Sequence, residues 1–568
     1  MFELKLKPIS PILITDSYKL SHKDFEVDGV TEIYSNFTPR FTHYFKRKFP
    51  FFDDKIVVFG LQQAMIKIVE HWSDNFFKRP KAEVIAEAKR VLVPYIGMEN
   101  LSHFEELHDL GYLPLEIRAL KEGSVITKGI PTFTIRNTLP KFEWLPNYLE
   151  SVLSAESWKS LTVANIARQY RQLSQKYAEL TADDWSYIAF QNHDFSFRGQ
   201  SGWDSSAMTG AGWALFSAGS DNAPAIWALE NYYGADIENE TVFHSIPASE
   251  HSVTTLGINF FNKEDLKDGE TQYLKWVLTE RFKTGLVAFV LDSYDYFRAL
   301  TEIIPSLKNE IMGRDGKLVI RGDSGEPVNI IAGYRVKDLD QLVEAKDIRN
   351  VDDLVDRLSD FVETYENEIE VVKWNNKYYR FEYAYNDDSE KSFQGIASFE
   401  EMSEAEAKGT IEVLWEIFGG EVNSKGFKVL DSHIGHIYGD GMNYERSEST
   451  FKRLAEKGFS ACNIVFGVGS FTLNMLSRDD LGIAVKATNA MLENDVQLPL
   501  FKAPKTDSSK KSLKGYLKVY EVDGTITYDQ DVTFEQQQTG LLETVFLNGQ
   551  YIRLETLKEI RELAEKSL

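Results

Sequence analysis

Short apolar runs that end in Gly, Asp or Ser, each followed by a helical stretch, recur along the middle of the chain. The runs at 188–190, 287–292, 318–323, 427–432 and 461–467 are predicted to be strands. Strands that alternate with helices indicate parallel βαβ units, and a barrel is one way to close them. Reactive side chains collect at the carboxyl ends of the strands in such folds. We therefore expect the chemistry in the polar residues that end these runs.

The two ends of the chain have a different pattern. Residues 56–70 are predicted as a strand end that passes into a helix, and 81–93 as a polar helix ended by Pro94. Residues 113–135 indicate strands joined by glycine turns. The C-terminal part, 510–568, returns to β-like sequence and ends in an amphipathic helix. The ends are expected to supply a β-rich domain beside the α/β core.

Residues 336–425 interrupt the alternation with many acidic side chains and a cluster of aromatic ones. We interpret them as an inserted set of helices plus a hairpin. A solvated elaboration without chemistry is the simpler interpretation; a cover for the active site or a partner surface is the alternative. The expected divisions are an N-terminal α+β region (1–150), a catalytic core (151–335 and 426–480), this insertion, and a C-terminal region (481–568) that packs with the N-terminal one.

Composition limits the classes of protein to consider. With 568 residues, 43% hydrophobic and 13% aromatic, the chain can fill two or three folded domains. A formal net charge of -24 makes nucleic acid a poor partner. A few Arg and Lys side chains can still line a cleft for a small phosphorylated substrate.

The single cysteine, Cys462, excludes a disulfide framework within the chain and fits a reducing compartment. There is no cysteine cluster or HExxH pattern, so a zinc site is not expected. Neither a signal peptide nor an apolar run of about 18 residues is apparent. A cytoplasmic location is the expectation.

The segment 244–255 places His251 beside Glu250 among small residues. A loop of this kind that begins a helix offers free N–H groups to a phosphate. A neutral imidazole oriented by a carboxylate can be a nucleophile or a general base. A purely structural histidine is the alternative.

Two of the predicted strands are followed by charged residues. Asp292 and Asp295 can hold Mg²⁺, orient a histidine or bind ribose hydroxyls, although Asp292 or Ser293 can also simply cap the next helix. Arg321 can bind phosphate oxygens and Asp323 can accept hydrogen bonds from sugar hydroxyls, with an ordinary turn as the alternative.

Two glycine-rich turns, 438–442 and 466–470, suit a phosphate cradle, but neither matches a Walker A or dinucleotide fingerprint. Phe195, Arg198 and Asp221 offer an aromatic face, a cation and a carboxylate for a flat heteroaromatic amide. A core phenylalanine with a surface ion pair would give the same pattern.

Taken together, these segments resemble the nicotinate/nicotinamide phosphoribosyltransferase family, and within it the nicotinamide enzymes of NAD salvage. The matching segments, in order, are TDSYK (15–19), DFSFRG, GSDN, IPASEHS, DSYD, RGDSG, GDG, FGVGS and SRDDLGIAVK. The likeness extends to 541–549 and leaves out mainly the insertion. It implies an irregular parallel α/β barrel of the type II phosphoribosyltransferase kind, with an additional mixed β-rich domain from the N- and C-terminal parts.

The same resemblance implies a homodimer with shared active sites, and a reaction of nicotinamide with phosphoribosyl pyrophosphate that gives nicotinamide mononucleotide and pyrophosphate. The pyridine would stack between Phe195 of one subunit and Tyr18 of the other, while Asp221 accepts from the carboxamide and repels nicotinate. Arg198 would contact the amide oxygen or the product phosphate. Further substrate residues implied are Asp16, Ser245, Ala248, Arg321, Gly439, Asp440, Gly469 and Ser470. Phosphate-binding cations implied are Arg40, Arg478, Lys486, Lys502 and Lys510.

By the same resemblance, His251 matches the histidine that the family phosphorylates from ATP, with Glu250 and Asp292 positioning it and Asp323 holding phosphoribose. Mg²⁺, whose ligands the sequence does not identify, would stabilise the leaving pyrophosphate together with the cations.

Three positions depart from the family pattern: Ala288 in place of a serine of the vertebrate enzymes, Ser470 in place of a glycine, and Gly322 where proline is common. None removes a charged group. The alternatives are a nicotinate phosphoribosyltransferase, against which Asp221 argues, and a non-catalytic NAD-metabolite-binding protein on the same fold.

Overall fold

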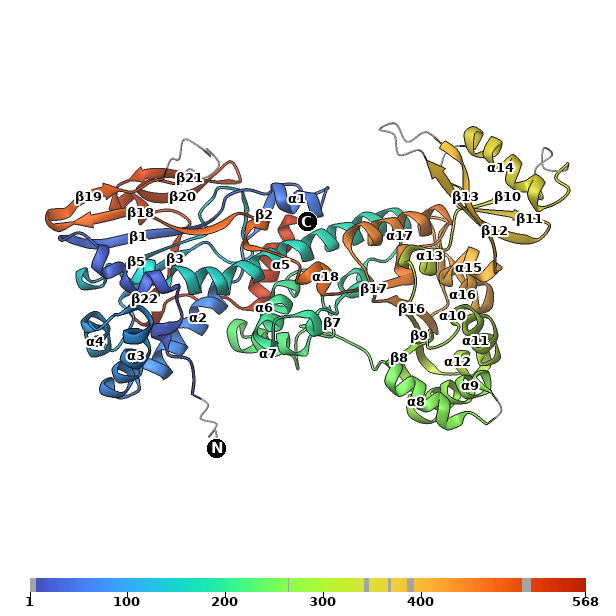
Figure 1. Ribbon diagram of the computed structural model, residues 1–568, viewed down its shortest axis with the longest axis horizontal. Helices are drawn as coiled ribbons and strands as arrows, with labels where there is room; N and C mark the ends of the chain where they lie inside the picture. Colours follow the sequence, from blue (N-terminus) through green and yellow to red (C-terminus); the bar gives the residue numbers. More distant parts are fainter. Residues whose placement is uncertain (1–6, 264, 342–346, 366–368, 386–392, 503–511) are drawn as a thin grey trace. The chain divides into compact units, whose positions relative to one another are not determined.

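The computed structural model describes residues 7–263, 265–341, 347–365, 369–385, 393–502 and 512–568. The chain forms two compact units, each assembled from separate stretches. The first unit combines Met1–Gln172, Ser196–Phe243 and Leu473–Leu568, and the second combines Leu173–Phe195 and His244–Thr472. Figure 1 shows these elements and labels many of them.

A seven-stranded sheet forms the centre of the first unit, in the order β19-β18-β1-β5-β3-β22-β23. Its neighbouring strands pair antiparallel. The strands are β1 (Val30–Pro39), β3 (Leu115–Ala119), β5 (Phe133–Asn137), β18 (Ile483–Leu492), β19 (Val496–Pro499), β22 (Glu543–Leu547) and β23 (Gln550–Tyr551). Residues from both ends of the chain share this sheet, which confirms the expected β-rich domain.

Helices and two short ladders complete the first unit. The ladders pair β2 (Lys55–Val57) with β4 (Val125–Thr127), and β20 (Tyr516–Val522) with β21 (Thr525–Val532). The helices are α1 (His43–Lys48), α2 (Leu61–Trp72), α3 (Lys81–Ile96), α4 (Ser102–Leu110), α5 (Leu145–Thr181, which continues into the second unit), α6 (Trp203–Trp213), α7 (Ala223–Tyr233), α19 (Phe534–Gln537) and α20 (Leu557–Ala564).

The predicted end of the helix at 81–93, which is α3 in the structure, was wrong. Pro94 lies inside the last turn of α3, and the helix continues to Ile96. Gly97 ends it instead, with a φ of 71° that favours glycine. The predicted strand-to-helix passage at 56–70, by contrast, is confirmed by β2 and α2.

The second unit is built around a curled parallel sheet, a half-barrel whose strands run in the order β6-β17-β16-β9-β8. These strands are β6 (Asn192–Asp194), β8 (Thr284–Val290), β9 (Asp315–Gly322), β16 (Ile434–Tyr438) and β17 (Ile464–Val468). The mixed α/β fold class predicted from the sequence is therefore confirmed.

Two of the predicted core strands were misplaced. Residues 188–190 lie in a 3₁₀ helix (Ser186–Phe190), and the strand follows at β6. The run at 427–432 contains β15 (Lys428–Leu430), which pairs antiparallel with β14 (Gly420–Val422) outside the parallel sheet. The core strand is the next one, β16, which Gly435 and His436 make less apolar in sequence.

The helices of the second unit follow its strands. They are α8 (His251–Phe261), α9 (Leu266–Trp276), α10 (Tyr296–Arg298), α11 (Ile304–Ser306), α12 (Lys308–Met312), α13 (Pro327–Ala332), α14 (Val351–Tyr365), α15 (Glu404–Lys408), α16 (Thr410–Phe418), α17 (Tyr444–Glu456) and α18 (Ser470–Leu473).

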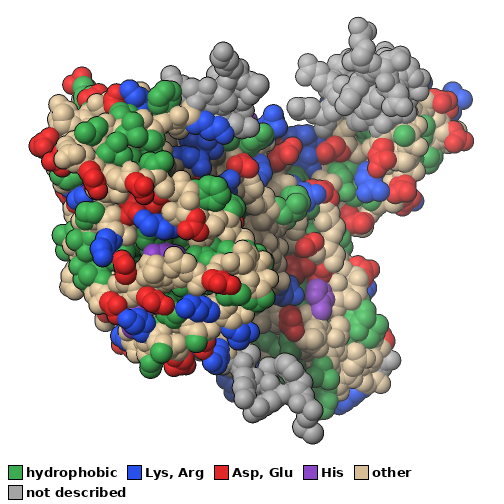
Figure 2. Space-filling model, turned by 60° about the vertical axis from the view of Figure 1, so that its left-hand side comes forward, with side chains coloured by type: hydrophobic (Ala, Val, Ile, Leu, Met, Phe, Trp, Pro, Cys, Tyr) green, Lys and Arg blue, Asp and Glu red, His purple; other side chains and the backbone are tan. Residues whose placement is uncertain are grey.

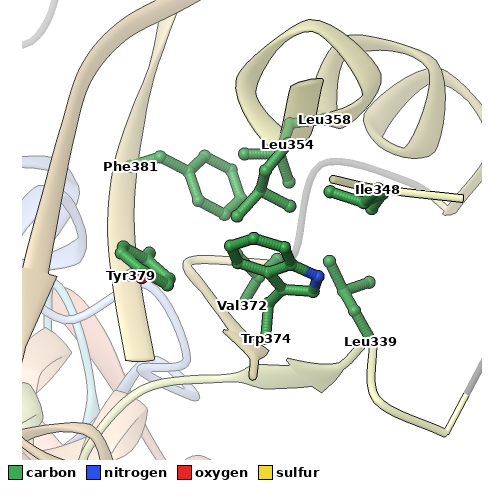
Figure 3. Close-up of a cluster of buried hydrophobic side chains, with 8 residues drawn as sticks. All are labelled: Leu339, Ile348, Leu354, Leu358, Val372, Trp374, Tyr379 and Phe381. Atoms are coloured by element: carbon green, nitrogen blue, oxygen red, sulfur yellow. The ribbon is translucent and has the colours of Figure 1, made fainter. Parts of the chain in front are cut away.

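The insertion carries a small core of its own. Its four-stranded sheet has the order β10-β11-β12-β13, formed by Val336–Asp338, Val371–Trp374, Lys377–Tyr385 and Phe393–Met402. Helix α14 lies against this sheet (Figure 1), and its Leu354 and Leu358, one turn apart, pack with Trp374, Tyr379 and Phe381 (Figure 3). Each buried side chain of this size contributes about 1.5–3 kcal/mol, so the insertion stabilises itself locally.

Along the described part of the chain, no helix is long and apolar enough to cross a membrane. Acidic and basic side chains are interspersed over the face in Figure 2. The excess of acid therefore leaves room for local cationic patches.

Candidate active site

The polar residues predicted from the strand ends lie together at the carboxyl edge of the parallel sheet. Strand register aligns Val290 with Arg321 and Tyr438 with Gly322. The residues that follow these strands therefore emerge at one edge. The site residues placed there are Phe195 after β6, Asp292 after β8, Arg321 and Asp323 at the end of β9, Gly439 and Asp440 after β16, and Gly469 and Ser470 after β17.

His251 is held by Asp292. The imidazole Nε2 lies 3.0 Å from Asp292 Oδ1, with Asp292 3% and His251 50% exposed. Asp292 Oδ2 accepts the Asp323 backbone N–H at 3.0 Å and the Ser324 hydroxyl at 2.6 Å. The helix that follows is capped by Asp295, whose carboxylate accepts from the Arg298 N–H. Capping is thus assigned to Asp295, which leaves Asp292 to link His251 to the RGDSG loop.

The loop before His251 is fastened to β8. Ser249 donates its N–H to the Ala288 carbonyl at 3.0 Å, and its hydroxyl accepts the Val290 N–H at 2.9 Å. Ala248 pairs with Ala288 as an isolated parallel bridge. Glu250 is the N-cap residue of α8, and its carboxylate accepts from the hydroxyl of Ser252. Between the two predicted positioning carboxylates, Asp292 is therefore the one with a hydrogen bond to the imidazole.

Arg321 and Asp323 leave hydrogen-bonding capacity unused. Their side chains form an ion pair at 2.7 Å, and the Arg321 guanidinium lies 5.6 Å from the centroid of the Phe195 ring. Within the described residues, Arg321 Nε and Asp323 Oδ1 are buried without a hydrogen-bond partner. Buried polar atoms are nearly always paired, so this donor and this acceptor indicate a place for a polar ligand.

Phe195 occupies space that two glycines provide. A Cβ added at Gly467 would come within 2.2 Å of the Phe195 ring, and one at Gly439 within 2.9 Å. The ring also packs against a buried cluster that includes Ala288 and Ile437. At Gly469 a Cβ would meet nothing within 4 Å.

The steric role therefore belongs to Gly439 and Gly467, whereas the residues predicted from the segment 466–470 were Gly469 and Ser470. A glycine inside a strand is itself a sign of close approach by another group, and Gly467 lies within β17. That signal was available in the sequence.

In the first unit, Asp16, Tyr18 and Arg478 line one cavity of about 600 Å³. Asp16 accepts hydrogen bonds from the hydroxyls of Ser151 and Tyr18. Tyr18 is 62% exposed, so its ring is available to stack on another group. The TDSYK motif thus presents an acid and an aromatic ring near one of the predicted cations.

Three of the predicted phosphate-binding cations line a second cavity of about 540 Å³ in the same unit: Arg40, Lys486 and Lys502. Arg40 donates to the Gly482 carbonyl at 2.7 Å, and Lys486 lies 3.1 Å from Glu150. Burial, together with the positive charge of Arg478, lowers the pKa of Arg40. Cations that repel one another in this way favour an anion between them. Lys510 lies outside the described residues.

Arg198 and Asp221 are both exposed in the first unit, at a 3₁₀ turn (Phe197–Gly199) and directly after β7 (Gly219–Ser220). Ser245 is exposed in the second.

The loop that follows Arg198 is held by a lysine that was not predicted from the sequence. Lys159 is buried and donates to Gln200, Ser205 and Asn474. Lys159 lies in the middle of the long helix α5, and its partners are distant in the sequence. No local motif therefore indicates its role.

Among the described residues there is no group of three or more His, Cys, Asp or Glu side chains placed to hold a metal ion. The Mg²⁺ ligands stay unassigned by the protein geometry. Mg²⁺ commonly binds through one or two carboxylates plus substrate phosphates rather than in a cage of protein side chains.

The chain matches one family model and several known proteins over most of its length. The model of the nicotinate phosphoribosyltransferase (NAPRTase) family matches residues 190–550. A nicotinamide phosphoribosyltransferase of Acinetobacter baylyi is 36% identical over 571 residues, covering 99% of this chain and 98% of the relative. A nicotinamide phosphoribosyltransferase of Xanthomonas campestris pv. campestris is 27% identical over 566 residues, covering 98% of each.

Among solved structures, a nicotinate-nucleotide pyrophosphorylase from Pyrococcus furiosus has a TM-score of 0.49 at 11% identity, covering 100% of this chain and 98% of that one. A score this low supports no conclusion about fold or function. The sequence relatives and the family model are the informative matches.

Proposed function

This chain belongs to the nicotinate phosphoribosyltransferase family, and we propose that it joins nicotinamide to phosphoribosyl pyrophosphate, giving nicotinamide mononucleotide and pyrophosphate. The network of His251, Asp292 and the RGDSG loop beside Arg321 carries the proposal. Asp221 supports the amide over the acid, because a carboxylate repels the negative charge of nicotinate.

The site residues divide the work of the transfer. Phe195 offers its face to the pyridine ring. Arg321 Nε donates to a phosphate oxygen, and Asp323 Oδ1 accepts from a ribose hydroxyl. Neither atom has a protein partner among the residues that the structure describes. The ring nitrogen then attacks ribose C1 as the bond from C1 to the pyrophosphate oxygen breaks. The cations gathered around Arg40 would bind the departing pyrophosphate. Mg²⁺ would add charge neutralisation on the pyrophosphate when bound with it.

ATP would act through His251. Nε2 of the imidazole is engaged by Asp292, so Nδ1 is the nitrogen left to attack the γ-phosphorus of ATP. The negative charge of Asp292 stabilises the imidazolium as the N–P bond forms and the bond to ADP breaks.

The proposed active unit is a homodimer in which Tyr18 of one subunit completes the pyridine site of the other. The exposure of Tyr18 supports this, since a largely exposed aromatic ring next to Asp16 is suited to cover a flat ligand. The cytoplasmic location stays a prediction.

Product formation with each pyridine tests the proposed function directly. Pyrophosphate release is measured with phosphoribosyl pyrophosphate, Mg²⁺ and either nicotinamide or nicotinate, with and without ATP. We expect turnover with nicotinamide and little with nicotinate. Turnover of nicotinate alone would reassign the substrate, and no release with either pyridine would indicate a binding protein.

His251→Ala is expected to remove the ATP response while leaving ATP-independent synthesis. The ratio of rates with and without ATP should fall to about 1, because the nucleophile that receives the phosphoryl group is gone. Nicotinamide mononucleotide formation measures both rates. An ATP response equal to that of the wild type would contradict the phosphohistidine step.

Asp221→Asn is expected to relax discrimination against nicotinate. Loss of the negative charge should raise the ratio of kcat/KM for nicotinate over nicotinamide by about tenfold or more. Asp109→Asn, which neutralises an exposed carboxylate of the same unit paired with Lys81, serves as the matched control. An unchanged ratio in Asp221→Asn would show that the charge of Asp221 does not discriminate against nicotinate.

A further inference from the structure

The second unit contains another cavity, of about 340 Å³, at the opposite end of the parallel strands. Lys317 is the third residue of β9, and Cys462 precedes β17. Lys317 and Arg321 point to the same face of β9 because they are four positions apart, about 13 Å along the strand. We name this cavity the amino-end pocket; it is separate from the strand ends that carry His251.

Most polar side chains that line the amino-end pocket already have partners. Asn423 donates to the Thr181 carbonyl and Asn463 to the Lys428 carbonyl. Asp183 and Asp184 accept from Ser424 and Ser186 respectively. This leaves few groups that need a ligand.

Two donors in the pocket are unpaired. The Tyr187 hydroxyl is buried with no hydrogen-bond partner, and the Lys317 ammonium has no hydrogen bond or ion pair within the described part of the chain. Tyr187, Lys317 and Cys462 all line this one cavity. A buried hydroxyl without an acceptor costs free energy that a ligand oxygen would recover, and the half-buried Lys317 would attract a negatively charged oxygen.

The surroundings of Lys317 keep it available. The absence of a side chain at Gly435 makes room for its methylene chain, since a Cβ there would lie 3.2 Å from Lys317 Cδ. Asp431 also acts on Lys317 electrostatically, but its Oδ1 is bound by His433 at 2.7 Å. Burial lowers the pKa of Lys317 and raises that of Tyr187. The Tyr187 hydroxyl therefore stays a hydrogen-bond donor.

We propose that the amino-end pocket binds a small monocarboxylate through the Lys317 ammonium and the Tyr187 hydroxyl. Val429, Leu430 and Ile434 line the same cavity and would contact a short apolar body. The exposed carboxylates of Asp183, Asp184 and Glu421 stand at its edge. These carboxylates repel a doubly charged phosphate more strongly than a singly charged anion. A ligand with one negative charge and a few carbon atoms therefore fits the pocket best.

Cys462 provides a selective readout, because it is the only cysteine in the chain. The rate of its alkylation by iodoacetamide is measured on the full-length protein at constant ionic strength, with isobutyrate, isobutyramide or inorganic phosphate added. We expect isobutyrate to slow alkylation about fivefold or more at saturation, and the neutral amide and phosphate to have little effect. No turnover is involved, so the result is independent of the proposed function.

Variants identify the residues responsible. Lys317→Met keeps the length of the side chain and should abolish protection by isobutyrate, while Tyr187→Phe should weaken it severalfold. Lys452→Met, at an exposed lysine of α17, is the control and should behave as wild type. Thermal unfolding shows which variants fold; should Lys317→Met fail to fold, Tyr187→Phe and the acid–amide comparison decide. Absence of protection, equal protection by the amide, stronger protection by phosphate, or protection that persists in Lys317→Met would each overturn the proposal.

Discussion

Asp292→Asn is expected to lower phosphoribosyl transfer about 10- to 100-fold, both with and without ATP. The buried carboxylate accepts hydrogen bonds from His251, the Asp323 N–H and Ser324 on its two oxygens. An amide has only one oxygen, so it must turn an NH₂ group toward His251 or toward the RGDSG loop. Losing hydrogen bonds to a buried charged group costs about 1.5–3 kcal/mol each. The measurement is kcat/KM for pyrophosphate release under both conditions.

Asp295→Asn is the matched control for Asp292. Asp295 caps α10, and asparagine caps helices as well as aspartate does. Its activity should therefore stay close to that of the wild type. A loss in Asp292→Asn confined to the ATP-stimulated rate would show that Asp292 serves His251 alone and does not hold the loop that carries Arg321.

Gly467→Ala is expected to disturb the pyridine site more than its small size suggests. The new methyl group would lie 2.2 Å from the Phe195 ring and 2.9 Å from the Gly439 backbone. Overpacking of this kind costs about 1–3 kcal/mol, and the ring must move out of its place. We expect the KM for nicotinamide to rise about tenfold or more, with a smaller change in the KM for phosphoribosyl pyrophosphate.

Stability separates the steric effect from other causes. Gly469→Ala adds the same methyl group two residues later, where nothing lies within 4 Å, so its thermal unfolding should match the wild type while that of Gly467→Ala shifts downward. A normal KM for nicotinamide in Gly467→Ala would mean that the Phe195 ring does not contact the pyridine.

The clustering of the candidate site residues was predictable because parallel strands end at one edge. Asp292, Arg321 and Asp323 follow apolar runs that the sequence marks clearly, and the structure places all three at that edge. Strand β16 was harder to recognise because Gly435 and His436 break its apolar pattern. The local sequence also favoured the run at 427–432, which pairs elsewhere.

The division of roles between neighbouring residues was not predictable from the sequence. Asp292 and Asp295 have the same chemistry and flank the same turn, and only the fold shows that one holds an imidazole while the other caps a helix. Gly467 and Gly469 differ in the same way, because the clash that Gly467 avoids is with the ring of Phe195, which follows β6. Lys159 has no motif at all, and its role comes from partners distant in the chain.

The seven-stranded sheet has a consequence for synthesis. β1 pairs with β18, so that Pro39 meets Ile483, and β3 pairs with β22. At roughly 5–20 residues per second, the ribosome needs tens of seconds after making β1 before it delivers these partners. Throughout that interval one edge of β1 has no partner strand. A nascent chain that stalls before residue 483 therefore presents an unpaired apolar strand, which favours aggregation and makes binding by a chaperone useful.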